Sequence, residues 1–335
     1  MTRARTVAVV GAGSWGTALA MVLARNGHST RLWGRDAAQL SRLQNEHCNA
    51  TYLPGYQFPD GLSICADLSA ALDSAEWVLV CVPSHGFASC LESLAALLKP
   101  EAGLVWATKG FEPDTARLLD ELVVESRGHR SKRAVLSGPS FALEVAAGLP
   151  TAVTLAANTP QVAQELAEVF HDESFRVYTS EDMVGVQVGG AVKNVLAIAA
   201  GIADGLIFGA NTRAALITRG LAELSRLGGA MGGQPRTFMG LAGLGDLLLT
   251  CTDDQSRNRR FGLALAQGES AMDAMAHLGQ VVEGYRNSRE VMILAERYDI
   301  DMPIAAQVYK VLYEDLAPRA AVQALLSRAL TREDG

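Results

Sequence analysis

Basic residues are in the minority in this sequence. The 335 residues contain 29 lysines and arginines against 36 aspartates and glutamates, which gives a formal net charge of −7 at pH 7. This balance provides no general attraction for nucleic acid or for an anionic membrane surface, so neither is expected as a partner. An anionic ligand must therefore be held by a local group of basic residues.

Paired cysteines and metal-ligand patterns are also lacking. The five cysteines are odd in number and have no paired spacing, which predicts free thiols in a reducing compartment, and we expect a cytoplasmic protein. No cluster of His or Cys has the spacing of a metal site, so no metal is predicted. The apolar run after the opening MTRAR soon becomes a glycine motif with Ser and Trp, and secretion is not predicted.

One long apolar run, DMVGVQVGGAVKNVLAIAAGIAD, lies between Asp182 and Asp204. It contains no proline and its residues favour helix, and a helix that is apolar on every side is normally buried. Its glycines and its central Lys193–Asn194 pair favour a buried helix of a soluble protein over a stable membrane span. A buried lysine is either neutral or beside an anion. Lys193 is thus an activated lysine facing a cleft, or a lysine that pairs with a structural carboxylate or reaches the surface.

The N-terminal segment has the pattern of a dinucleotide-binding turn. Residues 6–10 predict a strand, GAGSWG follows at residues 11–16, and the helical TALAMVLARNG comes next. In this pattern Gly11 allows the tight turn, Gly13 lets a pyrophosphate approach the backbone, and Gly16 lets the helix pack on the strand. The helix amides then meet the phosphates.

The next predicted strand, Ser29–Trp33, leads to Arg35 and Asp36. An arginine at this place binds the extra phosphate of NADP, whereas an acid binds the ribose hydroxyls of NAD. Both residue types are present, so NADP and NAD both stay open as cofactors.

Further apolar runs predict a mostly parallel sheet, because they are continuous rather than alternating, as in strands covered by helices on both faces. These runs are Trp77–Val82, Leu104–Thr108 and Ala134–Ser137. Thr151–Ala157 and Phe175–Ser180 are expected as the last two strands, and a loop is expected at Tyr52-Leu-Pro-Gly. Ligands of such sheets lie beyond the carboxyl ends of the strands. The candidates placed there are Ser84, Lys109, Gly138 and Ser140, whereas His85 is interpreted as a loop or packing residue.

From Asp182 onward helical patterns dominate, so we expect an N-terminal α/β Rossmann domain (residues 1–181) and an all-α substrate domain (residues 182–335). Ser256 is a suitable helix N-cap, and the amides behind it with Arg257 and Asn258 predict a phosphate cradle, with a charged surface turn as the alternative. Glu283 is a candidate acceptor for ribose hydroxyls. The Ala/Leu-rich C-terminal helices cover either their own core or a second copy, so a homodimer stays open.

Taken together, these segments resemble the bacterial NAD(P)-dependent glycerol-3-phosphate dehydrogenases. The resemblance rests on GAGSWGTALA, YLPG, the Lys109-Gly110 turn, SGPSFALEV, GGAVKNVLAIAAGIADG, NTRAALITRGLAE, GLAGLGDLLLTCT, SRNRRFG and VVEG, in one order up to about residue 284. It implies a Rossmann domain followed by a helical domain. It also implies interconversion of sn-glycerol 3-phosphate and dihydroxyacetone phosphate, which supplies the backbone of phospholipids.

The resemblance also implies a set of site residues. It places Ser14, Trp15, Arg35, Tyr52, Lys109, Ala142, Arg257, Val281 and Glu283 at the cofactor, in addition to Gly11, Gly13 and Gly16. Around the small phosphorylated substrate it places Lys109, Gly138, Ser140, Lys193, Asp246, Ser256, Arg257 and Asn258. Lys193 would be the proton acceptor.

The residues alone support this chemistry. Since the nicotinamide carries the hydride, the protein must orient the substrate and move one hydroxyl proton. A lysine that is desolvated near another cation, Lys109, has a pKa lowered toward the working pH of a general base, and Asp246 would orient it.

Two other functions remain: a 3-hydroxyacid or 6-phosphogluconate type dehydrogenase, which also uses a Lys-Asn pair, and a non-catalytic dinucleotide sensor. The SRNRR segment without a further arginine cluster favours a small phosphate ester. A sensor would not need Lys193, Asp246 and Arg257 together.

Overall fold

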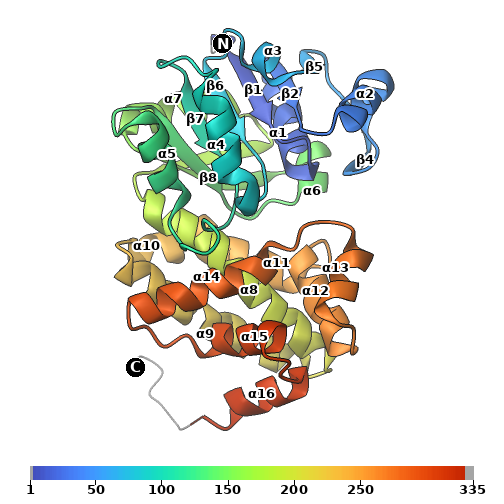
Figure 1. Cartoon of the computed structure of the whole chain (residues 1–335), viewed down its shortest axis with the longest axis vertical. Coiled ribbons are helices and arrows are strands. Elements are labelled where there is room, and N and C mark those ends of the chain that lie inside the picture. Colours follow the sequence, from blue (N-terminus) through green and yellow to red (C-terminus); the bar gives the residue numbers. More distant parts are fainter. Residues whose placement is uncertain (1–2, 329–335) are drawn as a thin grey trace.

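The computed structural model describes residues 3–328 and has two parts, a sheet domain above and a helical domain below in Figure 1. Eight strands form one sheet in the order β10-β9-β8-β7-β6-β1-β2-β5. Their bounds are β1 (Thr6–Val10), β2 (Ser29–Trp33), β5 (Leu62–Ile64), β6 (Trp77–Val80), β7 (Gly103–Trp106), β8 (Arg133–Ser137), β9 (Thr151–Ala157) and β10 (Phe175–Ser180). Every neighbouring pair is parallel except β8 and β9, which are antiparallel.

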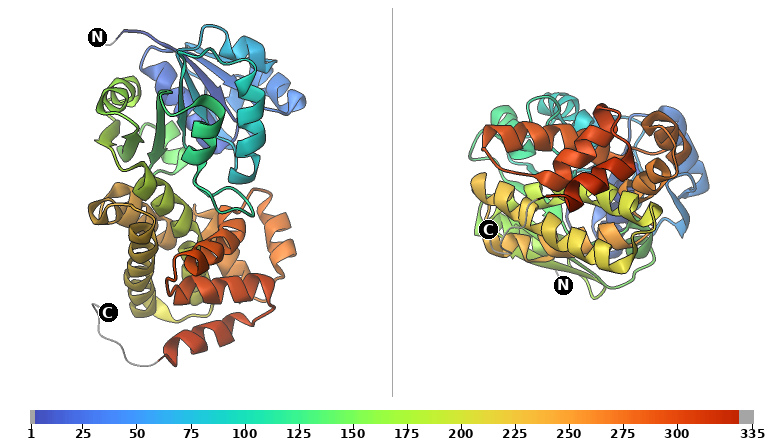
Figure 2. Two further views of the ribbon diagram at one scale, coloured as in Figure 1. Left: turned by 60° about the vertical axis from the view of Figure 1, so that its left-hand side comes forward. Right: turned by 90° about the horizontal axis from the view of Figure 1, so that it is seen from below.

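Helices cover both faces of this sheet (Figure 2). Successive side chains of β1 face opposite sides: Val7 and Val9 belong to one core cluster, whereas Ala8 and Val10 belong to the other. The first cluster includes buried side chains from four helices: α1 (Ser14–Arg25), α2 (Ala37–Glu46), α6 (Ala142–Ala146) and α7 (Pro160–Phe170). The second includes α3 (Leu68–Leu72), α4 (Phe87–Ala95) and α5 (Leu119–Arg127). Burial on both faces accounts for the continuous apolar runs of the central strands.

The predicted loop at Tyr52-Leu-Pro-Gly is wrong for its last three residues. Leu53–Gln57 forms β4, which pairs antiparallel with the short β3 (Cys48–Asn49). Leu53 is buried against the sheet domain's core, so tertiary packing overrides the turn preference of the Pro-Gly pair. Tyr52 itself lies in the turn before β4, and β6 and β7 each end two residues before their predicted ends.

The remaining described chain, from residue 183 to residue 328, contains helices and no strand. The helices are α8 (Met183–Gly205), α9 (Gly209–Ala230), α10 (Pro235–Phe238), η2 (Leu241–Gly245, a π-helical turn), α11 (Asp246–Thr252), α12 (Arg257–Ala266), α13 (Ala271–Leu278), α14 (Glu283–Arg297), α15 (Pro303–Tyr313) and α16 (Pro318–Leu326). The predicted fold class, a mostly parallel Rossmann domain followed by an all-α domain, is confirmed.

Helix α8 is the axis of the helical domain, and the prediction of a buried helix is confirmed. It is long and apolar enough to cross a membrane, yet all of its apolar window is buried within the protein. Two of its glycines let neighbouring backbone approach: a Cβ atom at Gly189 would overlap the carbonyl oxygen of Ala242, and one at Gly201 would overlap that of Arg259. These contacts bring η2 and α12 against α8, which positions the polar residues described next.

Candidate active site

The glycine turn between β1 and α1 has the geometry that a dinucleotide needs. Gly11 has φ +120°, and a Cβ atom there would lie 2.6 Å from the carbonyl oxygen of Cys81. A Cβ atom at Gly16 would overlap the carbonyl oxygen of Gly11, so only glycine lets α1 pack this closely. A Cβ atom at Gly13 would meet no atom within 4 Å, which leaves the approach to the helix N-terminus open. The indole nitrogen of the half-buried Trp15 has no hydrogen-bond partner within the described residues. These features fit a bound pyrophosphate.

Beyond β2, the two residues with opposite implications for the cofactor differ in their contacts. The Asp36 carboxylate caps α2 by accepting hydrogen bonds from the amides of Ala38 (2.9 Å) and Gln39 (3.1 Å). Arg35 is exposed and makes no ion pair or hydrogen bond with any residue from 3 to 328. The arginine is therefore the side chain that is available to a ligand.

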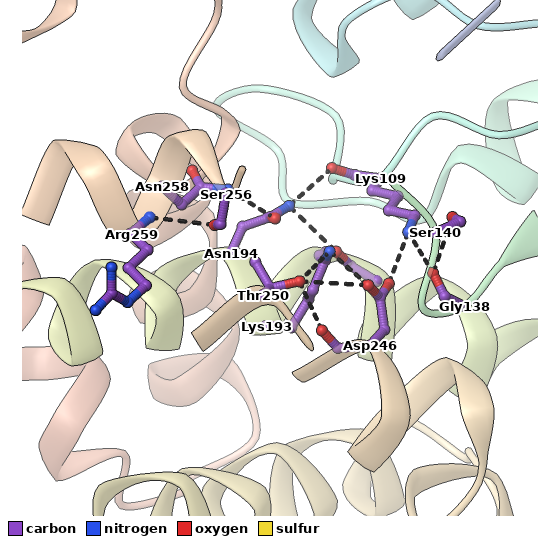
Figure 3. A network of polar contacts seen from close by, with 12 residues as sticks. Lys109, Gly138, Ser140, Lys193, Asn194, Asp246, Thr250, Ser256, Asn258 and Arg259 are labelled. Carbon is purple, nitrogen blue, oxygen red and sulfur yellow. Dashed lines mark hydrogen bonds and ion pairs between the residues drawn. The ribbon is translucent and has the colours of Figure 1, made fainter. Parts of the chain in front are cut away.

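A buried carboxylate joins two lysines where the sheet domain meets α8 (Figure 3). Asp246 accepts a hydrogen bond from Lys193 Nζ at Oδ1 and one from Lys109 Nζ at Oδ2, both at 2.7 Å. Lys193 Nζ also donates to Thr250 Oγ1 at 2.7 Å, and Lys109 Nζ donates to the Gly138 carbonyl at 3.0 Å. Asp246 is 1% exposed and Lys193 is 7% exposed. We call Lys109, Lys193 and Asp246 the lysine–aspartate centre.

Three elements supply the residues of this centre, and a fourth supplies its neighbour Gly138. Lys193 comes from the middle of α8, Asp246 begins α11 directly after the π-helical turn η2, and Lys109 follows β7. Gly138, with φ +148°, follows β8. Gly190 of α8 makes the meeting possible, because a Cβ atom there would lie 2.9 Å from Ser137 Oγ and 3.4 Å from Lys109 Cγ.

The centre has unusual electrostatics. The pKa of Lys193 is lowered from 10.5 to about 8: burial is the largest cause, Asp246 acts to raise this pKa, and the positive charge of Lys109 acts with burial to lower it. Burial acts to raise the pKa of Asp246, but the two lysines outweigh it and hold that pKa below its usual value. Lys193 therefore changes protonation near neutral pH, while Asp246 stays ionised.

Two asparagines extend the polar network toward α12. The Asn194 amide donates to the carbonyls of Gly190 (3.2 Å) and Lys109 (3.4 Å), and Asn258 Nδ2 donates to Asn194 Oδ1 at 2.9 Å. Asn258 Oδ1 in turn accepts from the amide of Gly284 at 2.9 Å. The start of α12 is thereby fixed beside the lysine–aspartate centre.

The predicted N-cap of α12 is present: Ser256 Oγ accepts from the amide of Arg259 at 3.2 Å. Arg257, the first residue of α12, is half-buried and makes one long contact, 3.4 Å, with Gln280 Oε1. Ser140 Oγ donates to the Gly138 carbonyl at 3.1 Å. The substrate candidates are thus grouped around the carboxyl ends of β7 and β8, the middle of α8, and the starts of α11 and α12.

Glu283, a predicted ribose acceptor, is engaged with the sheet domain in this structure. Its carboxylate accepts from the amide of Ser84 at 3.0 Å and from Ser84 Oγ at 2.6 Å. Burial raises the pKa of Glu283, and the hydrogen bonds from Ser84 oppose that rise. The other cofactor candidates are dispersed over several loops: Ser14 begins α1, Tyr52 precedes β4, Ala142 begins α6, and the exposed Val281 precedes α14.

Sequence reasoning assigned no role to Thr250 or Asn194, and it did not pair Ser84 with Glu283. Thr250 lies four residues after Asp246 on α11, and this spacing places both side chains on one helix face. The contact between them could therefore have been predicted from the sequence. Ser84 and Glu283 are 199 residues apart, and no local pattern joins them. Among residues 3–328 no three His, Cys, Asp or Glu side chains form a metal-binding group, and all five cysteines are free thiols.

Comparison with known proteins identifies the family. The family model of the NAD-dependent glycerol-3-phosphate dehydrogenase N-terminus matches residues 6–163, and that of the C-terminus matches residues 182–323. The chain belongs to the NAD-dependent glycerol-3-phosphate dehydrogenase family. The predicted family, an NAD(P)-dependent oxidoreductase, is confirmed.

Individual relatives agree over nearly the whole chain. A protein of Serratia proteamaculans named glycerol-3-phosphate dehydrogenase, NAD(P)+, is 55% identical over 330 residues, which are 98% of this chain and 97% of the relative. A protein of the same name from Pseudoalteromonas translucida is 56% identical over 328 residues, 98% of each chain. The crystal structure of glycerol-3-phosphate dehydrogenase from Coxiella burnetii is 49% identical, with a TM-score of 0.94, and the match covers 97% of this chain and 99% of that one. A D-mandelate dehydrogenase structure that is 12% identical, with a TM-score of 0.63 over 94% of this chain and 99% of that one, shares the fold.

Proposed function

We propose that the chain interconverts sn-glycerol 3-phosphate and dihydroxyacetone phosphate with NAD(P), and that Lys193 is the proton acceptor. The observation that carries this proposal is the lysine–aspartate centre: a buried lysine with a pKa of about 8 lies where the sheet domain meets the helical domain. A general base works best when its pKa lies near the working pH. The family and its relatives, named glycerol-3-phosphate dehydrogenase, support the substrate.

Lys193 has a position left for the substrate. An ammonium group has three donors, and in Lys193 two of them are directed to Asp246 Oδ1 and Thr250 Oγ1. Thr250 donates its own proton to the Asp246 carbonyl at 2.6 Å, so its oxygen is free to accept from the lysine. In the neutral amine, the third position holds the lone pair that takes the hydroxyl proton of glycerol 3-phosphate. In the reverse direction the ammonium form returns that proton to the oxygen of dihydroxyacetone phosphate.

The bound nicotinamide supplies or accepts the hydride. The residues proposed to hold the cofactor are Gly11, Gly13, Ser14, Trp15, Gly16, Arg35, Tyr52, Lys109, Ala142, Arg257, Val281 and Glu283. Because Asp36 caps α2 and Arg35 makes no hydrogen bond or ion pair among residues 3–328, Arg35 would bind the extra phosphate of NADP. We therefore propose that NADPH is bound in preference to NADH.

The phosphate of the substrate would lie at the start of α12. Ser256, Arg257 and Asn258 provide a capped helix N-terminus and one guanidinium, which together suit a phosphate dianion. Lys109, Gly138, Ser140, Lys193 and Asp246 would surround the reacting end of the substrate. Asn194 and Asn258 hold these two groups of residues in a fixed relation.

The division into residues 1–181 and 182–335 is proposed on the end of the sheet at Ser180 and the start of α8 at Met183. We also propose a cytoplasmic location, on the ground of the five free thiols, and a role in supplying glycerol 3-phosphate for phospholipid synthesis. A homodimer is also proposed, and Ile207, Met272 and Leu326, three large apolar side chains that the helical domain exposes on separate segments, are candidate contacts. Sedimentation at several concentrations tests the dimer.

The reaction is tested by following NADPH absorbance with the purified chain. Dihydroxyacetone phosphate should cause a rapid loss of absorbance, whereas unphosphorylated dihydroxyacetone and a small 3-keto acid should not. A faster reaction with the keto acid would show that the chain is a hydroxyacid dehydrogenase. No reaction with any of these substrates, although NADPH binds, would favour a dinucleotide sensor.

A further inference from the structure

Two exposed basic side chains flank the glycine turn. Arg35 follows β2, and His85 lies in the 3-10 turn η1 (Ser84–Gly86) after β6. In the sheet β1 lies between β6 and β2, and both of its neighbours are parallel to it. Since the carboxyl ends of parallel strands share one edge, Arg35 and His85 lie on opposite sides of the turn that follows β1.

The helical domain adds a second guanidinium, Arg286 of α14, to this edge. Glu283, the first residue of α14, accepts two hydrogen bonds from Ser84, and Arg286 lies three residues later on the same helix face. The start of α14 also touches the turn after β7, since a Cβ atom at Gly110 would lie 3.0 Å from Asn287 Oδ1. Arg286 is therefore held beside the carboxyl ends of the central strands.

The charges of these residues act on one another. Burial lowers the pKa of His85, and the positive charges of Arg286 and Arg35 lower it further. A guanidinium from the helical domain and one from the sheet domain thus both lie within electrostatic reach of the same imidazole.

The two guanidiniums have no ion-pair partner within the described chain. Neither Arg35 nor Arg286 forms an ion pair or hydrogen bond with a residue between 3 and 328. Two carboxylates on α14, Glu283 and Glu290, lie three residues before and four residues after Arg286, but neither pairs with it. Glu283 accepts its hydrogen bonds from Ser84; burial raises the pKa of both carboxyl groups, and the positive charge of Arg286 acts to lower both. Unpaired guanidiniums beside the glycine turn, in a chain of net charge −7, indicate an anionic ligand.

We propose that Arg286, which lies on the same edge as Arg35, binds a phosphate group of the dinucleotide, so that the helical domain contributes one arm of the cofactor's anion site. This inference rests on the proposed use of NAD(P), and it adds a residue that neither the sequence patterns nor the glycine turn indicated. The pyrophosphate of a dinucleotide lies at the N-terminus of the helix after β1, between Arg35 and His85. An arginine suits it because the planar guanidinium donates two hydrogen bonds to one phosphate.

The test compares Arg286→Ala with Arg286→Lys and with the control Arg289→Ala. Arg289 lies on the same helix, is 58% exposed, and has only a loose pair (3.8 Å) with the exposed Asp114. The probes are ADP-ribose and its 2′-phosphorylated form, measured by titration calorimetry at one fixed salt concentration. Loss of a charge-assisted hydrogen bond from Arg286 should weaken binding by about 10- to 100-fold. Arg286→Lys should lie between the parent and Arg286→Ala, and Arg289→Ala should bind as the parent does.

The two probes distinguish the possible phosphate groups. Equal weakening of both would place Arg286 at the pyrophosphate, and weakening of the 2′-phosphorylated probe alone would place it at the 2′-phosphate. Unchanged binding of both probes, or an equal loss in Arg289→Ala, overturns the proposal. If Arg286→Ala does not fold, Arg286→Lys decides, because it keeps the charge and loses the paired hydrogen bonds. A parent protein that binds ADP-ribose but does not reduce dihydroxyacetone phosphate would refute the proposed reaction and leave this site intact.

Discussion

Replacing Lys193 with methionine should separate activity from stability. The pKa of Lys193 falls from 10.5 to about 8 chiefly because the side chain is buried. A pKa unit corresponds to about 1.4 kcal/mol, so keeping the ammonium charged in the folded protein at pH 7 costs roughly 3 kcal/mol. Methionine has a similar unbranched length and no charge. Asp246 keeps its second partner, Lys109, in the variant, so no buried carboxylate is left alone.

The activity should fall while the fold remains. Turnover should drop by the ~10²–10⁴ that a positioned general acid–base contributes. In the parent, the rate of glycerol 3-phosphate oxidation should rise with pH through an apparent pKa near 8, because neutral Lys193 is the base. That pH dependence should disappear in Lys193→Met.

Stability should change with pH in a defined direction. Below pH 8 the lysine is protonated in both the folded and the unfolded chain, so the full cost of the buried charge is present in the parent. Between pH 8 and 10.5 the folded parent has lost this proton and the unfolded chain has not, so the free energy of unfolding of the parent rises with pH. Urea unfolding of both proteins at pH 7 and pH 10 measures this. The variant should be at least as stable as the parent at pH 7 and should lose that advantage at pH 10.

Two results would refute this reasoning. Near-parent turnover with the same pH dependence would move the proton transfer to another group, with Lys109 as the next candidate. A variant that is much less stable than the parent at pH 7 would show that the Lys193–Asp246 pair is a structural ion pair.

Three further changes test the rest of the site. Arg35→Ala should weaken the binding of NADPH by roughly 1.5–3 kcal/mol, the free energy of a charge-assisted hydrogen bond, and the binding of NADH by less. An equal loss of affinity for both cofactors would contradict a role at the extra phosphate. Arg257→Ala should raise the KM for dihydroxyacetone phosphate and lower turnover, because remote phosphate binding helps to align the carbonyl; unchanged steady-state kinetics would place the phosphate elsewhere. Asp246→Asn should shift the pH dependence of oxidation to lower pH, since Asp246 acts to raise the pKa of Lys193; an unshifted profile would show that Asp246 does not set the pKa of the catalytic base.

Much of the fold follows from local patterns. The central strands and α8 are buried on all sides, so their apolar runs are continuous, and the glycines of the first turn have steric roles that the sequence motif states directly. The antiparallel pairing of β8 with β9 could not be predicted, because the residues of a buried strand do not encode its direction. The β4 strand was missed for a related reason: its pairing with β3 is set by contacts of Leu53 with the core.

In the candidate site, too, some residues could be predicted from the sequence and others could not. Lys193 stands out in sequence because it is the one charge in the apolar run between Asp182 and Asp204, and Ser256 stands out because it precedes a helix. The partners of such residues are less visible. Glu283 and Ser84 meet only because α14 returns to the sheet edge, and Arg286 gains its position from that contact. Sequence patterns therefore identify residues with unusual local surroundings, while contacts across the two domains require the structure.

The arrangement of two lysines on one carboxylate explains how Lys193 can act as a base. If Lys193 were the only partner of Asp246, deprotonation of Lys193 would leave a buried carboxylate unpaired. The free-energy cost of that unpaired charge would hold the lysine in its charged form. Lys109 removes this cost, since it keeps its own hydrogen bond of 2.7 Å to the second carboxylate oxygen. The same positive charge disfavours a second ammonium nearby and lowers the pKa of Lys193. Lys109 thus allows Lys193 to lose its proton while Asp246 stays ionised and paired, which is the state that glycerol 3-phosphate oxidation requires.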